Sequence, residues 1–346
     1  MQGISHITRL WLILIAYGPA LCHAQSPPST GAAQAAYQAY LATNLPRAFA
    51  TGPGSAFGWG GGTGTTESVQ AAALAVCAAR IQPAPNMGAC RLYATDLAIA
   101  GQPASPVPGP LRSTWNYSLD PDARFVWRGP AAAAGVYLWA HGSGVNGSDA
   151  RGEQPQSHVR AFNNAGFDIV RFDRDPIADR DRDRVAGWMA DGLTLLRSLG
   201  YKRVVVGGHS RGAWNALMML RYPYLADVII AIAPAAHGGG GSTNLSAQYD
   251  DLRRIVADVR ASDVRASDVR ASAVRVAFVQ FAGDAFAADM PGRRSLMERL
   301  RPKVGSVLII DQPGGLTGHY ASNETAFAER YGPCLLQFAL GGPDHC

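Results

Sequence analysis

Val204-Val205-Val206-Gly207-Gly208-His209-Ser210-Arg211-Gly212-Ala213 joins a run of β-branched residues to a helical pattern through the sequence Gly-x-Ser-x-Gly. The valines predict a short buried strand, and residues 213–220 predict the helix that follows it. A strand-to-helix turn this sharp leaves no room for side chains at positions 208 and 212, where the chain has glycine. A serine on such a turn is lifted out of the sheet, so Ser210 is the candidate nucleophile.

Predicted strands and helices alternate on both sides of this turn, from Thr114 onward, which is typical of a mostly parallel sheet covered on both faces. The predicted strands cover residues 115–118, 123–127, 136–139, 167–172, 204–206, 228–232, 276–281 and 306–310. The predicted helices cover residues 157–165, 185–199, 213–220, 292–300 and 325–338. These elements account for most of the chain after its proline-rich stretch at 101–110.

Eight strands with the Gly-x-Ser-x-Gly turn after the fifth resemble the α/β-hydrolase superfamily, in particular secreted bacterial serine hydrolases of the dienelactone hydrolase and esterase-like kind. The resemblance covers roughly residues 114–338. It implies an α/β-hydrolase fold with an eight-stranded, mostly parallel sheet flanked by helices. It also implies that the functional residues lie at the carboxyl ends of the strands.

The loop after the third predicted strand reads Trp139-Ala140-His141-Gly142-Ser143-Gly144 and resembles the His-Gly-x-x oxyanion loop of that superfamily. There a backbone N–H just past His-Gly binds the negative oxygen that develops during acyl transfer. The resemblance assigns this donor to Ser143. The backbone N–H of Arg211, directly after the nucleophile, is the expected second donor.

The general base is sought among eight histidines, of which His237 and His319 are the credible candidates. His319 lies in a loop after the last predicted strand, and it gives the chain order serine, acid, histidine that the resemblance implies. His237 follows the sixth predicted strand, where it is better placed as a cap or pocket residue. His319 is therefore the expected base.

The acid that orients the base is expected after the seventh predicted strand. Asp284 follows that strand and one glycine directly, and it is the preferred candidate. Many relatives place this acid a few residues later, which keeps Asp289 as the alternative. Asp311, after the last strand, is a weaker third candidate.

The sequence predicts four parts along the chain. Residues 1–24 have an arginine, then an apolar run, then small residues, as in a signal peptide. Residues 25–35 are expected to form a disordered leader, residues 36–105 a small α+β module, and residues 106–346 the catalytic domain. The module resembles small secreted cysteine-paired α+β modules, because an Ala-rich helix ends in Cys77 and Cys90 is followed by Arg-Leu-Tyr.

Composition and cysteine usage narrow the class of protein further. The formal net charge is +5, and the basic residues are nearly all scattered arginines, which does not indicate nucleic-acid binding. After signal cleavage four cysteines remain, and the local pairs Cys77 with Cys90 and Cys334 with Cys346 are the most economical of three pairings. The sequence therefore predicts a periplasmic or secreted protein without stable membrane insertion.

The predicted activity is hydrolysis of a small-molecule or polymeric carboxylic ester through an acyl-enzyme, with no metal or organic cofactor. An acidic run between Asp168 and Asp183 alternates with arginines and indicates an ion-pair network in place of a calcium site. Amide or peptide hydrolysis and acyl transfer to another acceptor use the same residues and stay as alternatives, as does an inactive binding protein of this fold. A five-residue repeat from Val259 to Ala273 is interpreted as an expanded linker.

Overall fold

The computed structural model describes residue 28 and residues 31–81, 88–144, 148–177, 181–222, 224–237, 242–259 and 274–346. The predicted signal peptide, the glycine run at 238–241 and nearly all of the five-residue repeat lie outside the described residues. No helix among the described residues is long and apolar enough to cross a membrane.

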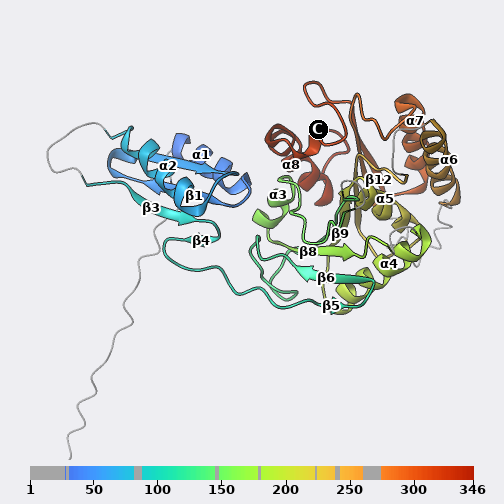
Figure 1. Cartoon of the computed structure of the whole chain (residues 1–346), viewed down its shortest axis with the longest axis horizontal. Helices are drawn as coiled ribbons and strands as arrows, with labels where there is room; N and C mark the ends of the chain where they lie inside the picture. The colour runs from blue at the N-terminus through green and yellow to red at the C-terminus, as the bar shows by residue number, and fades with distance from the viewer. Residues whose placement is uncertain are drawn as a thin grey trace, which may run out of the picture.

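The described part of the chain contains an eight-stranded sheet at its centre, as the sequence predicts (Figure 1). Six neighbouring strands are parallel; β6 runs antiparallel to β8, and β5 antiparallel to β6. In spatial order the strands are β12 (Ser306–Asp311), β11 (Arg275–Gln280), β10 (Val228–Ile232), β9 (Val204–His209), β7 (Gly135–Ala140), β8 (Phe167–Arg174), β6 (Tyr117–Pro121) and β5 (Arg112–Ser113).

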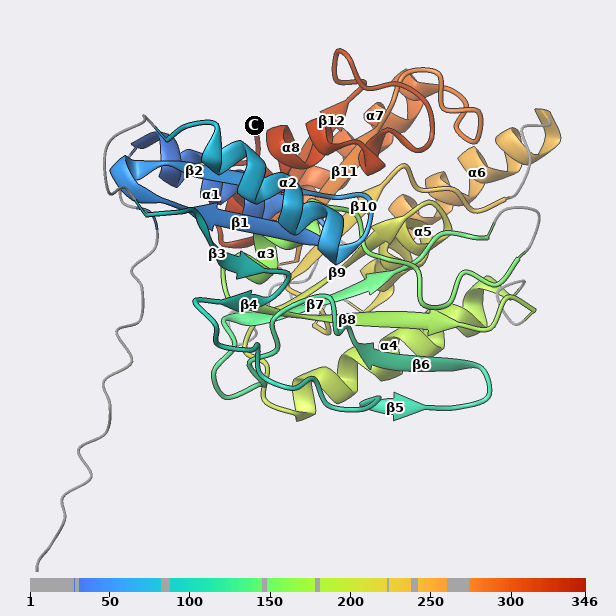
Figure 2. The same cartoon turned by 60° about the vertical axis from the view of Figure 1, so that its left-hand side comes forward.

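Helices cover both faces of this sheet (Figures 1 and 2). One face packs against α3 (Val159–Asn164) and α8 (Thr325–Ala339), and the other packs against α4 (Arg182–Ser198), α5 (Arg211–Met218), α6 (Ser242–Asp258) and α7 (Met290–Leu300). Because side chains alternate along a strand, Val136 and Leu138 of β7 enter the second core, whereas Tyr137 and Trp139 enter the first. Both faces are buried, which explains the continuous apolar runs in the sequence.

The front module has its own four-stranded antiparallel sheet, with α1 (Gly31–Ala42) and α2 (Thr66–Ala78) packed on it. The strands lie in the order β2 (Phe57–Gly61), β1 (Arg47–Thr51), β3 (Arg91–Thr95) and β4 (Ala98–Ile99). Disulfides join Cys77 to Cys90 and Cys334 to Cys346, so the predicted local pairing is confirmed. Short 3₁₀ turns complete the described chain as η1 (Pro53–Ser55), η4 (Met219–Arg221), η5 (Arg301–Lys303) and η6 (Ala321–Asn323).

Four segments differ from the sequence prediction. Residues 123–127 form no strand, because the Asp122 carboxylate accepts a bond from the Arg124 backbone N–H and turns the chain there. The helix α6 was not predicted, and α1 begins at Gly31, so its alanine-rich start occupies part of the leader predicted to be disordered. The glycine-rich stretch 52–64 contains β2, where a Cβ on Gly58 would lie 2.3 Å from the Ala73 carbonyl of α2.

The front module packs beside α3 and α8, which cover one face of the eight-stranded sheet (Figure 2). Asn164 of α3 donates its amide to the Leu41 carbonyl at 3.1 Å. The Arg160 guanidinium, also from α3, donates to the side-chain oxygen of Asn44 at 2.8 Å. This contact brings the loop after α1 toward the carboxyl ends of the central strands.

Candidate active site

Ser210 lies on a strained turn between β9 and α5. Its backbone has φ 55° and ψ −119°, a conformation that residues with a Cβ rarely adopt. The Ala140 carbonyl oxygen of β7 would lie 2.2 Å from a Cβ on Gly208 and 2.0 Å from one on Gly212. Glycine is therefore required on both sides of the serine, as the sequence pattern predicts.

Hydrogen bonds from the surrounding strands hold this conformation in place. The Ser210 N–H donates to the Ile232 carbonyl at 3.0 Å, and the Ser210 carbonyl accepts from Ala235 and Trp214 at 3.1 and 3.0 Å. Strain of this kind costs on the order of 1–3 kcal/mol and persists only where neighbouring structure enforces it. The serine is thus fixed at the end of β9, where its side chain lines a cavity.

His319 and Asp284 form a buried pair beside this turn. The Nδ1 atom of His319 lies 2.9 and 3.0 Å from the two carboxylate oxygens of Asp284. The Phe286 backbone N–H donates to the same carboxylate at 2.8 Å and holds it in place. A carboxylate acceptor places the proton of a neutral imidazole on Nδ1, which leaves a lone pair on Nε2 to accept a proton.

The other candidate acids have different partners in the structure. Asp289 caps the amino terminus of α7 and accepts from the Gly292 N–H at 2.9 Å. Asp311 accepts from Gln280 at 2.7 Å and pairs with Arg294 at 3.1 Å. Of the three aspartates, Asp284 is therefore the one that the structure places against His319.

His237, the other candidate base, lies away from this pair. Its Nε2 atom lies 2.9 Å from the Asp251 carboxylate of α6 and 3.0 Å from the Arg182 guanidinium of α4. These contacts tie the end of the loop after β10 to two helices, in keeping with the capping role that the sequence suggests.

His209, the residue before the nucleophile, connects the turn to the loop of the base. Its Nε2 lies 2.8 Å from the His319 carbonyl oxygen, and the two rings lie 4.7 Å apart. Burial, together with the nearby His319 imidazole, lowers the pKa of His209 to about 4. At neutral pH this ring is uncharged, and its Nε2–H is the donor that a carbonyl acceptor requires.

The predicted oxyanion loop reaches Ser210. A Cβ built on Gly142 would lie 3.4 Å from the Ser210 Cβ, and Ser143 lines the cavity that contains Ser210. Arg211 is the first residue of α5, where backbone N–H groups project from the helix terminus. The Arg211 guanidinium itself donates to the Ala236 carbonyl.

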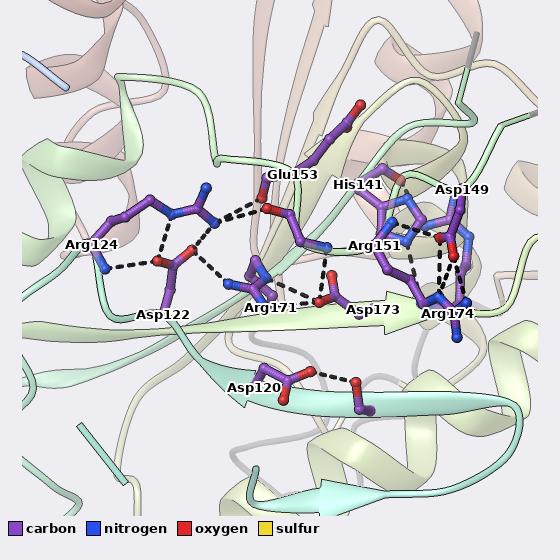
Figure 3. A network of polar contacts seen from close by, with 12 residues as sticks. Asp120, Asp122, Arg124, His141, Asp149, Arg151, Glu153, Arg171, Asp173 and Arg174 are labelled. Carbon is purple, nitrogen blue, oxygen red and sulfur yellow. Dashed lines mark hydrogen bonds and ion pairs between the residues drawn. The ribbon is translucent and has the colours of Figure 1, made fainter. Parts of the chain in front are cut away.

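A fully buried arginine bonds to the predicted oxyanion loop (Figure 3). Arg174, at the end of β8, donates one guanidinium nitrogen to the His141 carbonyl at 2.6 Å and the other to the Gly142 carbonyl at 3.1 Å. Its backbone N–H donates to His141 Nε2 at 3.2 Å. His141 Nδ1 in turn lies 2.6 Å from the Gly142 carbonyl oxygen.

These contacts determine how the loop presents its N–H groups. Desolvation and the Arg174 charge lower the pKa of His141 well below its usual value, so the ring is neutral, accepting at Nε2 and donating from Nδ1. The Gly142 carbonyl and the Ser143 N–H belong to one planar trans peptide and point in opposite directions. Fixing the carbonyl toward Arg174 therefore turns the Ser143 N–H away from it.

The acidic run near β8 is divided among separate partners. Asp173 pairs with Arg171 at 3.0 Å, Asp168 accepts from Tyr201 at 2.7 Å, and Asp181 caps α4. Asp183 pairs with Arg221 at 2.6 Å. Among the described residues no group of three or more His, Cys, Asp or Glu is arranged to hold a metal ion.

A cavity of about 250 Å³ lies beside the nucleophile. Its lining residues come from the front module, the oxyanion loop, the segment before α3, the strained turn and the loop after His319. They are Asn44, Gly142, Ser143, Glu153, Gln154, Pro155, Gln156, Ser157, His209, Ser210, Tyr320 and Asn323. Asn44 and the segment 153–157 were not predicted to belong to the site, although Glu-Gln-Pro-Gln-Ser is a conspicuously polar run at the start of a predicted helix.

In the central sheet β8 lies on the far side of β7 from β9, so the strand order crosses over at β7 and β8. A strained serine follows β9, an aspartate follows β11, and the histidine bonded to that aspartate follows β12. The chain has the α/β-hydrolase fold. In this fold the first residues after the carboxyl ends of parallel strands form the site. Ser210, Asp284 and the oxyanion loop all occupy such positions.

Comparison with known proteins gives only distant similarities. No family model matches this chain, and neither does any curated protein. Among solved structures it is similar to Est1E from Butyrivibrio proteoclasticus, with 11% identity, a TM-score of 0.44, and coverage of 68% of this chain and 100% of that one. The Pyrococcus furiosus esterase Pf2001 is 13% identical with a TM-score of 0.41, covering 65% of this chain and 84% of that one.

An S-formylglutathione hydrolase from Agrobacterium tumefaciens is likewise 13% identical, with a TM-score of 0.41 and coverage of 65% of this chain and 88% of that one. At these identities and scores the likenesses carry no argument about activity. The α/β-hydrolase assignment rests on the strand order and the turn.

The strain at Ser210 predicts an unusual stability difference. Glycine adopts the positive φ at position 210 without strain, whereas alanine does not. We therefore expect the free energy of unfolding of Ser210→Gly to exceed that of Ser210→Ala by about 1 kcal/mol. Urea unfolding of the two variants measures this difference. Alanine being the more stable of the two would show that the turn is not strained.

The buried histidines predict a loss of stability in acid. Burial lowers the pKa of His209 to about 4 and that of His158 to about 3, whereas the unfolded chain binds these protons near pH 6.5. Between these pKa values the unfolded chain binds more protons than the folded chain, so the free energy of unfolding falls as the pH falls. The loss begins near pH 6.5 and amounts to up to about 1.4 kcal/mol per pH unit for each group.

Replacing His209 with Asn is expected to reduce this slope between pH 6.5 and 4.5, because one buried site no longer takes up a proton on unfolding. Urea unfolding at several pH values measures the slope. His345→Asn removes an exposed imidazole and is the control. An unchanged slope in His209→Asn would contradict the neutral, buried state of this ring.

Proposed function

We propose that the protein is a serine hydrolase that cleaves carboxylic esters through Ser210, His319 and Asp284. The observation that carries the proposal is the buried His319–Asp284 pair, with Nδ1 bonded to the carboxylate, whose loop bonds to His209, the residue directly before a serine held at φ 55°. A serine is a weak nucleophile unless a positioned base removes its proton. An inactive binding protein would not need a strained serine together with an oriented imidazole.

In the proposed reaction the Ser210 Oγ forms a bond to the ester carbonyl carbon while its proton passes to His319 Nε2. The carbonyl π electrons move to oxygen, which accepts bonds from the N–H groups of Ser143 and Arg211. The intermediate collapses as the ester C–O bond breaks, and His319 returns the proton to the departing alkoxide. Water then repeats these steps, releasing the acid and restoring the serine.

Export from the cytoplasm fits this proposal. Two disulfides close loops in the chain, and disulfides persist in oxidising compartments. We therefore place the activity in the periplasm or outside the cell, where the predicted signal peptide would direct the protein.

The first test is hydrolysis of p-nitrophenyl acetate and longer esters, with labelling by a serine-directed phosphonate. Ser210→Ala and His319→Ala are each expected to lower kcat at least about 10³-fold, since both act in every step. Asp284→Asn should lower kcat by a similar factor, because an amide would favour the wrong imidazole tautomer.

Asp289→Ala is the matched control for the acid. It should keep kcat within a few-fold of wild type while losing about 1 kcal/mol of stability with the helix cap. A folded wild type that neither hydrolyses esters nor labels at Ser210 would refute the serine hydrolase. Labelling together with faster cleavage of amides, or transfer to an added alcohol, would move the assignment to an amidase or acyltransferase.

Arg174 supplies a further expectation, because it fixes the peptide that carries the Ser143 donor. Losing one oxyanion donor typically costs about 10²–10³-fold in kcat. Arg174→Gln and Arg174→Lys, which lack the two-pronged contact, are therefore expected to lower kcat at least about 10-fold with KM little changed.

Arg171→Gln is the control for this pair of variants, because Arg171 lies on the same strand but pairs with Asp122 and Asp173 (Figure 3). Steady-state kinetics of all three variants measure the effect on kcat. Thermal unfolding of the same variants shows whether a lower kcat comes from a misplaced loop or from loss of the folded state. Equal kcat in folded Arg174→Lys and wild type would show that the loop holds its orientation without this arginine.

A further inference from the structure

The cavity beside Ser210 is polar on nearly every side. Its described lining residues include no aliphatic side chain other than proline, and the one large ring besides histidine is Tyr320. Long acyl chains are bound by burying apolar surface, at about 25 cal/mol per Å², and this cavity offers little. Its volume of about 250 Å³ also lies below the range typical of pockets for drug-sized ligands.

We infer that this cavity binds the alcohol portion of a short-chain ester of a neutral, hydroxyl-rich molecule such as a sugar, and that the front module supplies one wall of it. The inference rests on the proposed ester hydrolysis and adds the class of substrate. It is carried by three of the four side-chain amides in the lining, Asn44, Gln154 and Gln156. Neighbouring groups fix which end of the Asn44 and Gln156 amides is the oxygen, and Gln154 has a buried nitrogen without a partner among the described residues.

The first amide is Asn44, which comes from the front module. Its Oδ1 atom accepts from the Arg160 Nε–H at 2.8 Å, and guanidinium is only a donor, so this end of the amide is the oxygen. The NH₂ end is left to donate. Arg160 is itself 1% exposed, stacks 4.5 Å over the Phe125 ring and donates to the Arg124 carbonyl at 3.0 Å. The catalytic domain thus determines how a front-module residue faces the cavity.

The second and third amides lie in the segment before α3. Gln156 is 9% exposed, and its Oε1 accepts from the Trp139 indole N–H at 2.9 Å, which again leaves the NH₂ end to donate. The Nε2 atom of Gln154 is buried and has no hydrogen-bond partner among the described residues. An unpaired buried donor costs about 1–3 kcal/mol, so a ligand oxygen at this position would remove that penalty.

The amides therefore present three NH₂ donors to ligand oxygens. Glu153 adds a carboxylate to the same lining, which disfavours an anionic ligand and can accept from a hydroxyl. A ligand that offers both acceptor oxygens and O–H donors without charge satisfies this set. Adjacent hydroxyls on a sugar ring have this character, whereas an acyl chain or a carboxylate does not.

The test compares two acetates with the same acyl group and similar ring size. Methyl 6-O-acetyl-glucoside carries hydroxyls and a ring oxygen, whereas cyclohexylmethyl acetate lacks them. We expect kcat/KM, followed by release of acetate, to be at least about 100-fold higher for the sugar ester, because sites built to bond hydroxyls reject analogues that lack them. Equal values, or a preference for the cyclohexyl ester, would overturn the inference.

Two substitutions locate the effect. Asn44→Leu and Gln154→Leu each remove an NH₂ donor at similar volume, and each should lower the ratio of the two kcat/KM values at least 10-fold. Asn164→Leu is the control, because Asn164 bonds to Leu41 across the same contact between module and domain but does not line the cavity. An unchanged ratio in folded Asn44→Leu would show that the front module forms no part of the site.

Failure of this inference is distinguishable from failure of the proposed function. If wild type cleaves both acetates equally well, the ester hydrolase stands and the sugar preference falls. If wild type cleaves neither acetate and does not react with the phosphonate at Ser210, both proposals fall together.

Discussion

The fold of the site depends on the close approach of one carbonyl group to two glycines. The Ala140 oxygen at the end of β7 occupies the space that side chains at 208 and 212 would need. This approach lets α5 start directly at the end of β9 and forces Ser210 to positive φ. The oxyanion loop leaves β7 at the same residue, so the nucleophile and the loop that faces it share one point of contact.

Hydrogen bonds then fix the positions of residues that are distant from this turn in sequence. His209 bonds to the carbonyl of His319, and Asp284 holds the His319 ring, so three loops after β9, β11 and β12 are joined. Arg174 likewise joins the loop after β7 to the end of β8. Each of these groups is buried, and a buried donor or acceptor left unpaired costs more than the bond itself contributes. Breaking one of these hydrogen bonds leaves its partner unpaired, so the bonded loops are stable only when all of the bonds are made.

The sequence was informative where local rules determine structure. Strand β10 was predicted with its observed bounds, and glycines 208 and 212 predicted the turn, because period, β-branching and steric exclusion are properties of short segments. Asp284 and Asp289 could not be separated that way, since the choice depends on which carboxylate meets a histidine 35 residues further on. Arg174, Asn44 and Gln154 escaped notice for the same reason: their roles come from contacts between elements far apart in the chain.

The front module contributes Asn44 to a cavity whose reactive serine belongs to another folding unit. One of the amides in the proposed alcohol site, Asn44, is thus encoded in a separate stretch of the gene from Ser210, whereas Gln154 and Gln156 belong to the same unit as the serine. Under the proposed alcohol site, substitutions in the loop after α1 are expected to change which ligands the cavity accepts while leaving the strained turn at Ser210 in place. Under the proposed function, replacement of the small module during evolution would change the substrates that the cavity accepts and would leave the turn at Ser210 unchanged.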